Sequence, residues 1–346
     1  MAVQIHFQGP TRYKIRSAVG LGKAILAVST RRLFKGPSLP GWNWFVEVST
    51  RVLQAETQAA FRMRDVREAR RYLDAMEIGS PALSSVDIRQ VVQPRFRGGW
   101  FIANGAESSR TMLYLHGGGY SFYPRAYRSF IAALTMAAKA RTLALDYRLT
   151  PEHRFPAQLD DALNAYRWLL ENGADRNQLI VAGDSAGGNL ALALLQAVRN
   201  ARLALPGLAV VLSPPTDFEA QLTGTQDSDW IEEPMLRQWA DWYCDRIERR
   251  NPLVSPIHAD LQCLPPIYIQ AGRAEILYDS IHAFAGFASR QGADVVLDSW
   301  DDMNHNFQIF GDDAPQSREA LQRIAKVIDT KLCMRMKPAG IAAAYG

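Results

Sequence analysis

The chain has 346 residues, of which 48% are hydrophobic and 21% charged, as is ordinary for a globular protein. It contains no apolar stretch long enough to span a bilayer, and its three cysteines lie far apart without a C-x-x-C pair. Composition therefore argues against a membrane span, a disulfide framework and a zinc site, and we expect a reducing, cytoplasmic compartment. Residues 1–46 hold seven Lys and Arg and no acid, whereas the rest of the chain is slightly acidic. This distribution argues against a nucleic-acid binder.

Residues 11–35 predict a basic amphipathic helix with apolar side chains near one face. These side chains are Ile15, Val19, Ile25 and Leu26. We expect this apolar stripe to pack against the protein. Peripheral attachment of the basic helix to an anionic membrane surface, or to the rim of an active site, is the alternative. A secretory signal is not expected, because Lys23 interrupts the apolar centre.

Breaker residues set the N-terminal region apart from the remainder of the chain. A cluster of Pro and Gly spans residues 37–41, and residues 42–76 then mix apolar and charged positions in a pattern typical of helix. Gly79-Ser80-Pro81 ends this region. We therefore predict a helical cap over residues 1–80 and a main domain over residues 81–346.

The main domain begins with strand-like segments. Residues 86–92 and 99–103 suit an antiparallel pair, and an apolar strand at 111–115 runs directly into His116-Gly117-Gly118-Gly119-Tyr120. Three consecutive glycines cost backbone entropy, so they are expected where the backbone must approach something closely. Their N–H groups can face an oxyanion, and the predicted donors are Gly117 and Gly118, together with Ala186 of the second glycine motif below. A flexible hairpin turn is the alternative for the three glycines.

A second glycine motif lies between the next strand and a helix. Residues 179–182 predict a buried strand, residues 190–195 favour a helix, and Gly183-Asp184-Ser185-Ala186-Gly187 lies between them. So short a passage requires a sharp turn that exposes the Ser185 hydroxyl beside the N–H of Ala186. We predict Ser185 to be a nucleophile, with a structural turn as the alternative. Asp184 is predicted to fix the turn through hydrogen bonds to neighbouring backbone.

Three motifs in this order resemble the hormone-sensitive-lipase family of α/β-hydrolases, of the GDSAG type among bacterial esterases. They are His116 to Gly119, the segment from Tyr147 to Ala157, and the pentapeptide around Ser185. The resemblance covers about residues 85–330. It implies an α/β-hydrolase fold with an eight-stranded, mostly parallel sheet flanked by helices. It also implies a cap built from the N-terminal helices and from an insertion after the sixth strand.

The sequence supports such an insertion independently. A predicted strand at 208–212 is stopped by Pro214-Pro215, and residues 217–255 form a long interval without strand character. Helical spacing relates Trp239, Trp242 and Tyr243 within this interval. These aromatic side chains either line an apolar pocket or belong to the core. The candidate pocket residues are Tyr120, Trp239 and Trp242.

A serine hydroxyl needs a base to take its proton, and the base needs a carboxylate to orient it. In this fold the chain order is serine, acid, histidine. His305 follows a predicted strand at 295–300 and is the predicted base. The family has His-Gly-Phe here, whereas this chain has Asn306 in place of the glycine. His153, His258 and His282 are predicted to be structural.

The acid is expected after a strand at 267–271. The family usually shows Asp-Pro-Leu-x-Asp there, with the first Asp catalytic, and register places Glu275 at that position and Asp279 at the second. A carboxylate one methylene longer still accepts the imidazole hydrogen bond. We therefore predict Glu275 as the acid, with Asp279 as the alternative.

The sequence thus predicts a serine carboxylesterase that hydrolyses short- to medium-chain acyl esters through an acyl-enzyme formed on Ser185. Its partner is a small-molecule ester, and the chemistry requires no metal or cofactor. A lactonase or amidase with the same residues is the alternative among enzymes. A non-catalytic ligand receptor on the same scaffold is the alternative from another class, although retention of Ser185 and His305 argues against it. Whether the chain forms a homodimer is left open.

Overall fold

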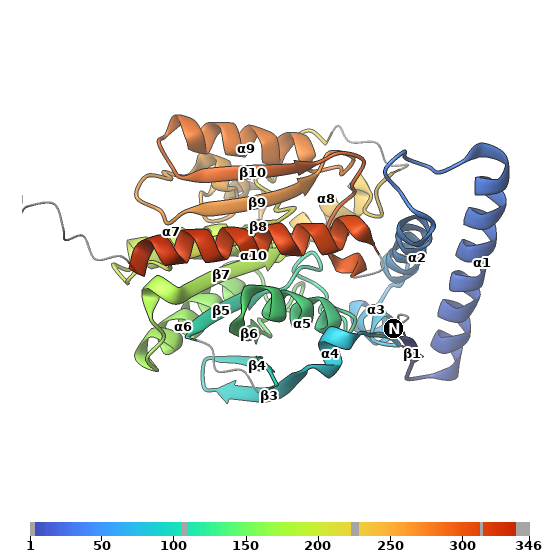
Figure 1. Ribbon diagram of the computed structural model, residues 1–346, viewed down its shortest axis with the longest axis horizontal. Coiled ribbons are helices and arrows are strands. Elements are labelled where there is room, and N and C mark those ends of the chain that lie inside the picture. The colour runs from blue at the N-terminus through green and yellow to red at the C-terminus, as the bar shows by residue number, and fades with distance from the viewer. Residues whose placement is uncertain (1–3, 105–108, 223–227, 312–313, 337–346) are drawn as a thin grey trace, which may run out of the picture.

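One central sheet brings the separate motifs together. The computed structural model describes residues 4–104, 109–222, 228–311 and 314–336, and eight strands form this sheet in the order β10-β9-β8-β7-β5-β6-β4-β3 (Figure 1). Neighbours from β10 to β6 run parallel, whereas β4 pairs antiparallel with both β6 and β3. This arrangement confirms the expected eight-stranded, mostly parallel sheet. Its strands are β3 Val86–Gln93, β4 Phe96–Ala103, β5 Arg110–Leu115, β6 Ala140–Leu145, β7 Leu179–Asp184, β8 Leu208–Leu212, β9 Ile267–Gly272 and β10 Val295–Trp300.

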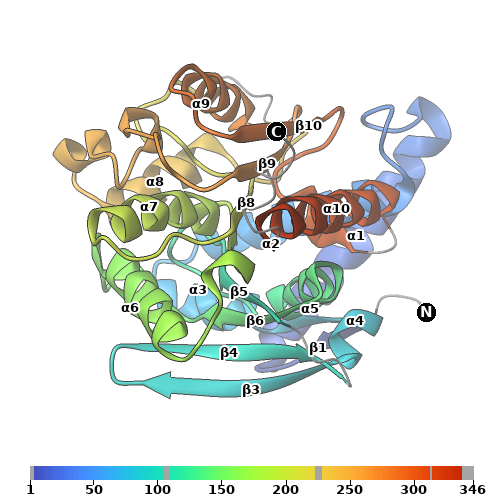
Figure 2. The ribbon, with the colours of Figure 1, turned by 60° about the vertical axis from the view of Figure 1, so that its left-hand side comes forward.

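Helices cover both faces of the sheet (Figure 2). They are α5 Tyr127–Ala138 and α10 Pro315–Met336 on one face, and α6 Ala157–Glu171, α7 Ala186–Asn200 and α9 Tyr278–Arg290 on the other. Side chains of one strand alternate between the two layers, so Leu113 packs with the α6–α7 side and Met112 with the α5–α10 side. Because the central strands are buried on both faces, their sequences are continuous apolar runs.

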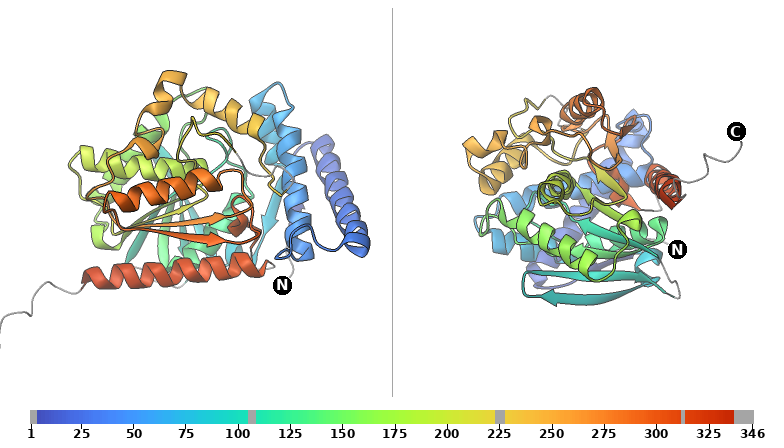
Figure 3. Two further views of the ribbon diagram at one scale, coloured as in Figure 1. Left: turned by 90° about the horizontal axis from the view of Figure 1, so that it is seen from above. Right: turned by 90° about the vertical axis from the view of Figure 1, so that its left-hand side faces the viewer.

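The N-terminal helices form a cap at one end of the molecule (Figure 3). They are α1 Thr11–Lys35, α2 Trp44–Phe61 and α3 Val66–Leu73. The helical segment expected over 42–76 is divided into α2 and α3. Asp65 caps the start of α3, where its side chain accepts the Arg67 N–H at 2.9 Å. A small antiparallel pair, β1 Gln4–Phe7 with β2 Met76–Gly79, joins the two ends of this region and was not anticipated. The domain boundary near residue 80 stays a prediction.

Helix α1 buries a different face from the expected one. Its buried side chains are Tyr13, Ser17, Ala24 and Val28, which pack toward α2 and α3. The expected stripe instead faces solvent, and Leu26, for example, is 69% exposed. The prediction that this stripe packs against the protein is therefore wrong. Small and polar groups let α1 approach α2 closely, and the Ser17 hydroxyl donates to Glu56 Oε2 at 2.9 Å.

A second set of cap residues comes from the long interval between β8 and β9. Helix α8 Glu233–Tyr243 lies there, and Met235 and Trp239 pack with side chains of α2 and α3. Part of the predicted insertion at 217–255, namely residues 223–227, lies outside the described residues. The remaining short elements are α4 Pro81–Ser84 and the 3-10 helices η1 Arg176–Gln178, η2 Arg246–Arg250, η3 Pro256–His258 and η4 Phe307–Phe310.

Candidate active site

Ser185 occupies a strained turn between β7 and α7. Its φ of 49° and ψ of −123° are unusual for a residue with a side chain. The turn is possible only because its flanks lack side chains: a Cβ on Gly183 would lie 2.3 Å from the Gly187 oxygen, and a Cβ on Gly187 would lie 2.0 Å from the Leu115 oxygen. The sequence therefore holds the Ser185 hydroxyl at the carboxyl edge of the sheet.

His305 meets this serine from the far end of the chain. Its Nε2 lies 2.8 Å from Ser185 Oγ, within hydrogen-bond distance. The loop after β10 carries it, and the Trp230 indole N–H donates to the His305 carbonyl at 2.7 Å. The imidazole is fully buried, and burial lowers the pKa of His305 to about 3. A neutral imidazole can accept the proton of the hydroxyl.

Glu275 lies on the other side of the imidazole. Its Oε2 is 3.8 Å from His305 Nδ1, which is longer than a hydrogen bond, and Ser213 Oγ donates to the same oxygen at 2.6 Å. Burial is the main cause that raises the pKa of Glu275 well above its usual value. Asp279, the alternative acid, is instead exposed in the first turn of α9. Of the two carboxylates, only Glu275 is placed beside the imidazole.

The glycine loop requires a correction to the expected oxyanion donors. The Gly117 N–H donates to Asp184 Oδ1 at 2.8 Å, so it is not free for a ligand. By contrast, the N–H groups of Gly118, Gly119 and Ala186 have no acceptor within the described residues. Gly118 and Gly119 have φ values of 95° and 58°, which glycine adopts readily. The sequence could not show that a side chain 67 positions away takes the Gly117 N–H.

Asp184 connects more of the site than the sequence suggested. Within the described residues its carboxylate makes no bond to the backbone of its own turn, contrary to the expectation. It instead accepts the Gly117 N–H from the loop after β5 and the hydroxyls of Tyr114 and Tyr127. It further accepts from Asn306 Nδ2 at 2.7 Å. Burial raises the pKa of Asp184 to about 6 despite these donors. One buried carboxylate thus links the serine turn, the glycine loop and the histidine loop.

Asp229 is a site residue that the sequence analysis missed. Its carboxylate accepts the Ile276 N–H at 2.9 Å and the His305 N–H at 3.3 Å. It therefore ties the backbone next to Glu275 to the backbone of the predicted base. Burial raises the pKa of Asp229 to about 6. No local motif surrounds this residue, because its two partners come from loops after β9 and β10.

The candidate pocket residues lie in different places. Trp239 is close to the glycine loop, since a Cβ on Gly119 would come within 2.5 Å of its indole ring. Trp242 packs, partly buried, in the cap cluster. Tyr120 is 2% exposed, and its ring stacks on Tyr243 at 3.8 Å between centroids. Tyr120 is therefore a core residue that offers no open surface to a substrate, contrary to the expectation. The histidines taken as structural, His153, His258 and His282, are all exposed on the surface.

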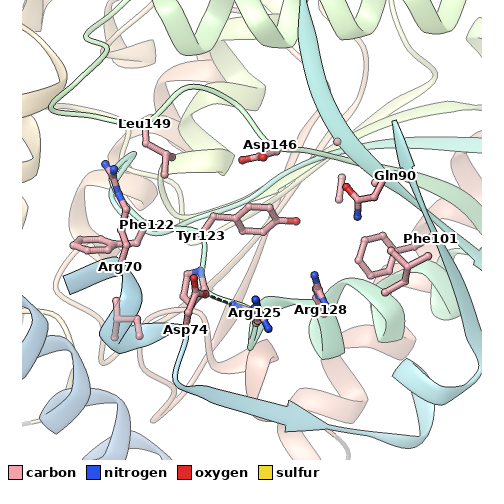
Figure 4. Close-up of a pocket in the computed structure, with 16 residues that line it drawn as sticks. Arg70, Asp74, Gln90, Phe101, Phe122, Tyr123, Arg125, Arg128, Asp146 and Leu149 are labelled. Atoms are coloured by element: carbon pink, nitrogen blue, oxygen red, sulfur yellow. Dashed lines mark hydrogen bonds between the residues drawn. The ribbon is translucent and has the colours of Figure 1, made fainter. Parts of the chain in front are cut away.

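A cavity of about 300 Å³ lies beside the glycine loop (Figure 4). Tyr123 points into it, and the Arg125 N–H donates to Asp74 Oδ1 at 3.1 Å at its edge. Phe122 belongs to its lining and also contacts Trp239 edge to face. None of the predicted site residues lines this cavity, so it is distinct from the place where Ser185 meets His305.

A serine on a strand-to-helix turn, in contact with an imidazole from the last sheet loop, defines the α/β-hydrolase class. Residues 112–309 match the family model described as alpha/beta hydrolase fold. An acetyl-hydrolase of Streptomyces hygroscopicus is 40% identical over 62% of this chain and 74% of its own length. The chain belongs to this α/β-hydrolase family and is a carboxylesterase-type hydrolase.

Solved structures place it among bacterial esterases. An esterase of the bacterial hormone-sensitive-lipase family is 30% identical with a TM-score of 0.70, and the match covers 94% of this chain and 100% of that one. The structure of EstE5 soaked with p-nitrophenyl butyrate is also 30% identical, with a TM-score of 0.76 and coverage of 84% and 100%. The resemblance noted from three motifs is thereby confirmed.

Proposed function

We propose that this esterase hydrolyses short- to medium-chain acyl esters, with Ser185 as nucleophile, His305 as base and Glu275 as the group that orients the base. The observation that carries the proposal is the 2.8 Å contact between Ser185 Oγ and His305 Nε2 on a strained turn. Glu275 is buried on the Nδ1 side of the same ring. When His305 gains a proton, we expect the 3.8 Å separation between His305 Nδ1 and Glu275 Oε2 to shorten to a hydrogen bond, which completes the triad. Catalytic contacts shorten in this way in a bound complex.

In the proposed reaction, Ser185 Oγ attacks the ester carbonyl carbon while Nε2 of His305 takes the hydroxyl proton. The resulting oxyanion accepts hydrogen bonds from the N–H groups of Gly118, Gly119 and Ala186. One such donor contributes about 2.7–4 kcal/mol in measured cases. His305 then gives the proton to the leaving alcohol, and a water molecule deprotonated by the same ring releases the acid and restores Ser185.

The proposed acyl length rests on the cap and on the relatives. Ser185 is 7% exposed, and Trp239 of α8 closes against Gly119. A site enclosed in this way favours small acyl groups over the long chains of triglycerides. An acetyl-hydrolase among the relatives, and the soak of EstE5 with a butyrate ester, agree with a short acyl group.

A hydrolysis profile tests both parts of the proposal. We expect kcat/KM to be highest for p-nitrophenyl esters of two to eight carbons and to fall for longer chains, with lactones and amides turned over more slowly. The Ser185→Ala variant should lose at least about 10⁴-fold in kcat, while Ser289→Ala, on an exposed face of α9, keeps the wild-type rate. Substantial residual turnover by Ser185→Ala would contradict the mechanism, and faster turnover of lactones would contradict the substrate class.

Two carboxylate variants decide which acid supports the base. Glu275→Gln should lower kcat by about 10²–10⁴-fold, because a neutral amide cannot stabilise the imidazolium. Asp279→Asn should leave kcat within about twofold, because Asp279 lies on the exposed surface of α9. If Asp279→Asn lowered kcat more than Glu275→Gln did, Asp279 would be the acid.

A further inference from the structure

The exposed side of helix α1 carries a continuous apolar row. We call it the outer face of α1; its side chains are Ile15, Val19, Leu26, Leu33 and Phe34, with exposures of 59%, 49%, 69%, 81% and 82%. At 100° per residue the first four lie within about 40° of one another. Of the twelve large apolar side chains exposed among the described residues, six lie on this one helix. Scattered exposed apolar residues are ordinary, but a continuous row marks a binding surface.

Positive charge flanks this row. Helix α1 contains seven Lys and Arg and no Asp or Glu. Arg31 and Arg32 pair with the buried carboxylate of Glu47 at 2.9 and 2.8 Å, which anchors the end of the helix. Lys14 and Lys23, on either side of the row, make no ion pair within the described residues. The surroundings of the outer face are therefore net positive.

The helix lies where a flat surface could reach it. It is the outermost element at one end of the molecule, with α2 between it and the sheet (Figures 1 and 3). Trp44, at the start of α2, is 41% exposed and donates its indole N–H to Ser29 Oγ at 3.0 Å, so its ring lies beside α1. Rings of this kind favour the boundary between an apolar phase and water. Within the described part of the chain, no helix has the length and apolarity to cross a bilayer.

We propose that the outer face of α1 binds the surface of a bilayer that contains anionic phospholipid, with the helix lying in the plane of the interface. The apolar row enters the boundary between headgroups and acyl chains, and the lysines beside it meet the lipid phosphates. A helix of 25 residues offers a contact about 37 Å long. A second copy of the chain fits this face less well, because pairing two α1 helices brings two sets of basic side chains together without a carboxylate on either helix.

Cosedimentation of the full chain with vesicles tests the proposal. Vesicles of mixed phosphatidylglycerol and phosphatidylcholine are compared with vesicles of phosphatidylcholine alone, at low and high salt. The test variant is Leu26→Ser/Leu33→Ser/Phe34→Ser. The matched control is Val92→Ser/Ile247→Ser/Val296→Ser, which removes exposed apolar side chains from other faces.

We expect wild type and the control to bind the anionic vesicles in a salt-dependent manner, with the partition coefficient of the α1 variant at least about tenfold lower. All three proteins should hydrolyse a soluble short-chain ester at the same rate, since none of these residues belongs to the site around Ser185. Failure of the wild type to bind anionic vesicles, or equal binding by both variants, would overturn the proposal. The proposal would also be overturned if the wild type were a dimer that bound no vesicles and the α1 variant were a monomer. That result would assign the outer face of α1 to a second copy of the chain.

Discussion

At the scale of single residues, Asn306 shows how this chain departs from the family it resembles. The family has glycine after the catalytic histidine, and the backbone at Asn306 has a φ of 51° and a ψ of 36°, which is left-handed. Asparagine tolerates this conformation better than most residues with a side chain. Its amide also donates to Asp184 at 2.7 Å, which glycine could not do. Asn306 therefore meets the backbone requirement and adds a tie between the histidine loop and the serine turn.

Two substitutions separate these contributions. Asn306→Gly keeps the left-handed backbone and loses the bond to Asp184, so we expect a folded protein with kcat several-fold lower. Asn306→Ala loses the same bond and also strains the backbone, so it should be less stable than Asn306→Gly by about 1 kcal/mol. Thermal unfolding and steady-state kinetics measure both effects. An alanine variant as stable as the glycine variant would show that the left-handed backbone is not required.

The pH dependence of activity reports on His305. Burial lowers the pKa of this imidazole to about 3, below the ordinary value of 6.5, so the ring stays neutral and able to accept a proton in mildly acidic solution. We expect the acid limb of kcat/KM to lie well below pH 6.5. The unfolded chain binds this proton below pH 6.5 and the folded chain does not, so this group lowers stability as pH falls from 6.5 toward 3. The pH profile of kcat/KM must therefore be measured at pH values at which the protein has been shown to stay folded.

An acid limb at pH 6.5 or above would contradict that expectation. If the acid limb of kcat/KM lies near pH 6, titration of Asp184 could cause it, because burial raises the pKa of Asp184 to about 6. Burial also raises the pKa of Asp229 to about 6, so the profiles of Asp184→Asn and Asp229→Asn are compared. A limb that vanishes in one of these variants belongs to that carboxylate, and one that persists in both belongs to neither.

At the scale of elements, the turn between β7 and α7 depends on close packing against β5. Gly187 lies in the first turn of α7, and a Cβ there would meet the Leu115 oxygen at 2.0 Å, a contact that only a backbone shift can relieve. Gly286 lies within α9, where a Cβ would meet only the flexible Arg290 side chain at 3.4 Å. Gly187 should therefore not tolerate alanine, whereas Gly286 should accept it.

We expect Gly187→Ala to lower the free energy of unfolding by at least about 2 kcal/mol or to prevent folding, because the helix must move away from the sheet. Gly286→Ala should be neutral or stabilising by up to about 1 kcal/mol, since alanine favours a helix interior. Chemical denaturation of the two variants provides the comparison. Equal stability of both would mean that the contact between α7 and β5 tolerates a side chain.

The elements differ in how far the sequence predicts them. The central parallel strands β5, β7, β8 and β9 were predictable because a strand buried on both faces is a short apolar run bounded by turn residues. The faces of α1 were not predictable, because both Leu26 and Val28 lie on plausible apolar stripes, and only the partner helix decides which one is buried. The placement of Ser185, Glu275 and His305 around one point follows from strand order, whereas the role of Asp229 depends on loop contacts that leave no local pattern.

At the scale of the whole molecule, the cap touches the loop that carries the predicted base. The Asn304 side chain, buried next to His305, donates to Thr50 Oγ1 of α2 at 2.8 Å. The Gly41 N–H, just before α2, donates to Asp302 Oδ2 at 2.8 Å, again in the same loop. Asp302 itself has a φ of 59°, so these contacts hold a loop with unfavourable backbone. The N-terminal region therefore supports the histidine loop as well as covering the site.

This support predicts a catalytic effect from a substitution in the cap. Thr50→Val keeps the shape of the side chain and leaves the buried Asn304 amide without its acceptor, which costs about 1–3 kcal/mol of stability. Because Asn304 adjoins His305, we also expect kcat for a short ester to fall several-fold while KM changes little. Thr330→Val, on the exposed face of α10, is the matched control and should change neither quantity. Lowered stability with an unchanged kcat would mean that the cap only covers the site and does not position the base.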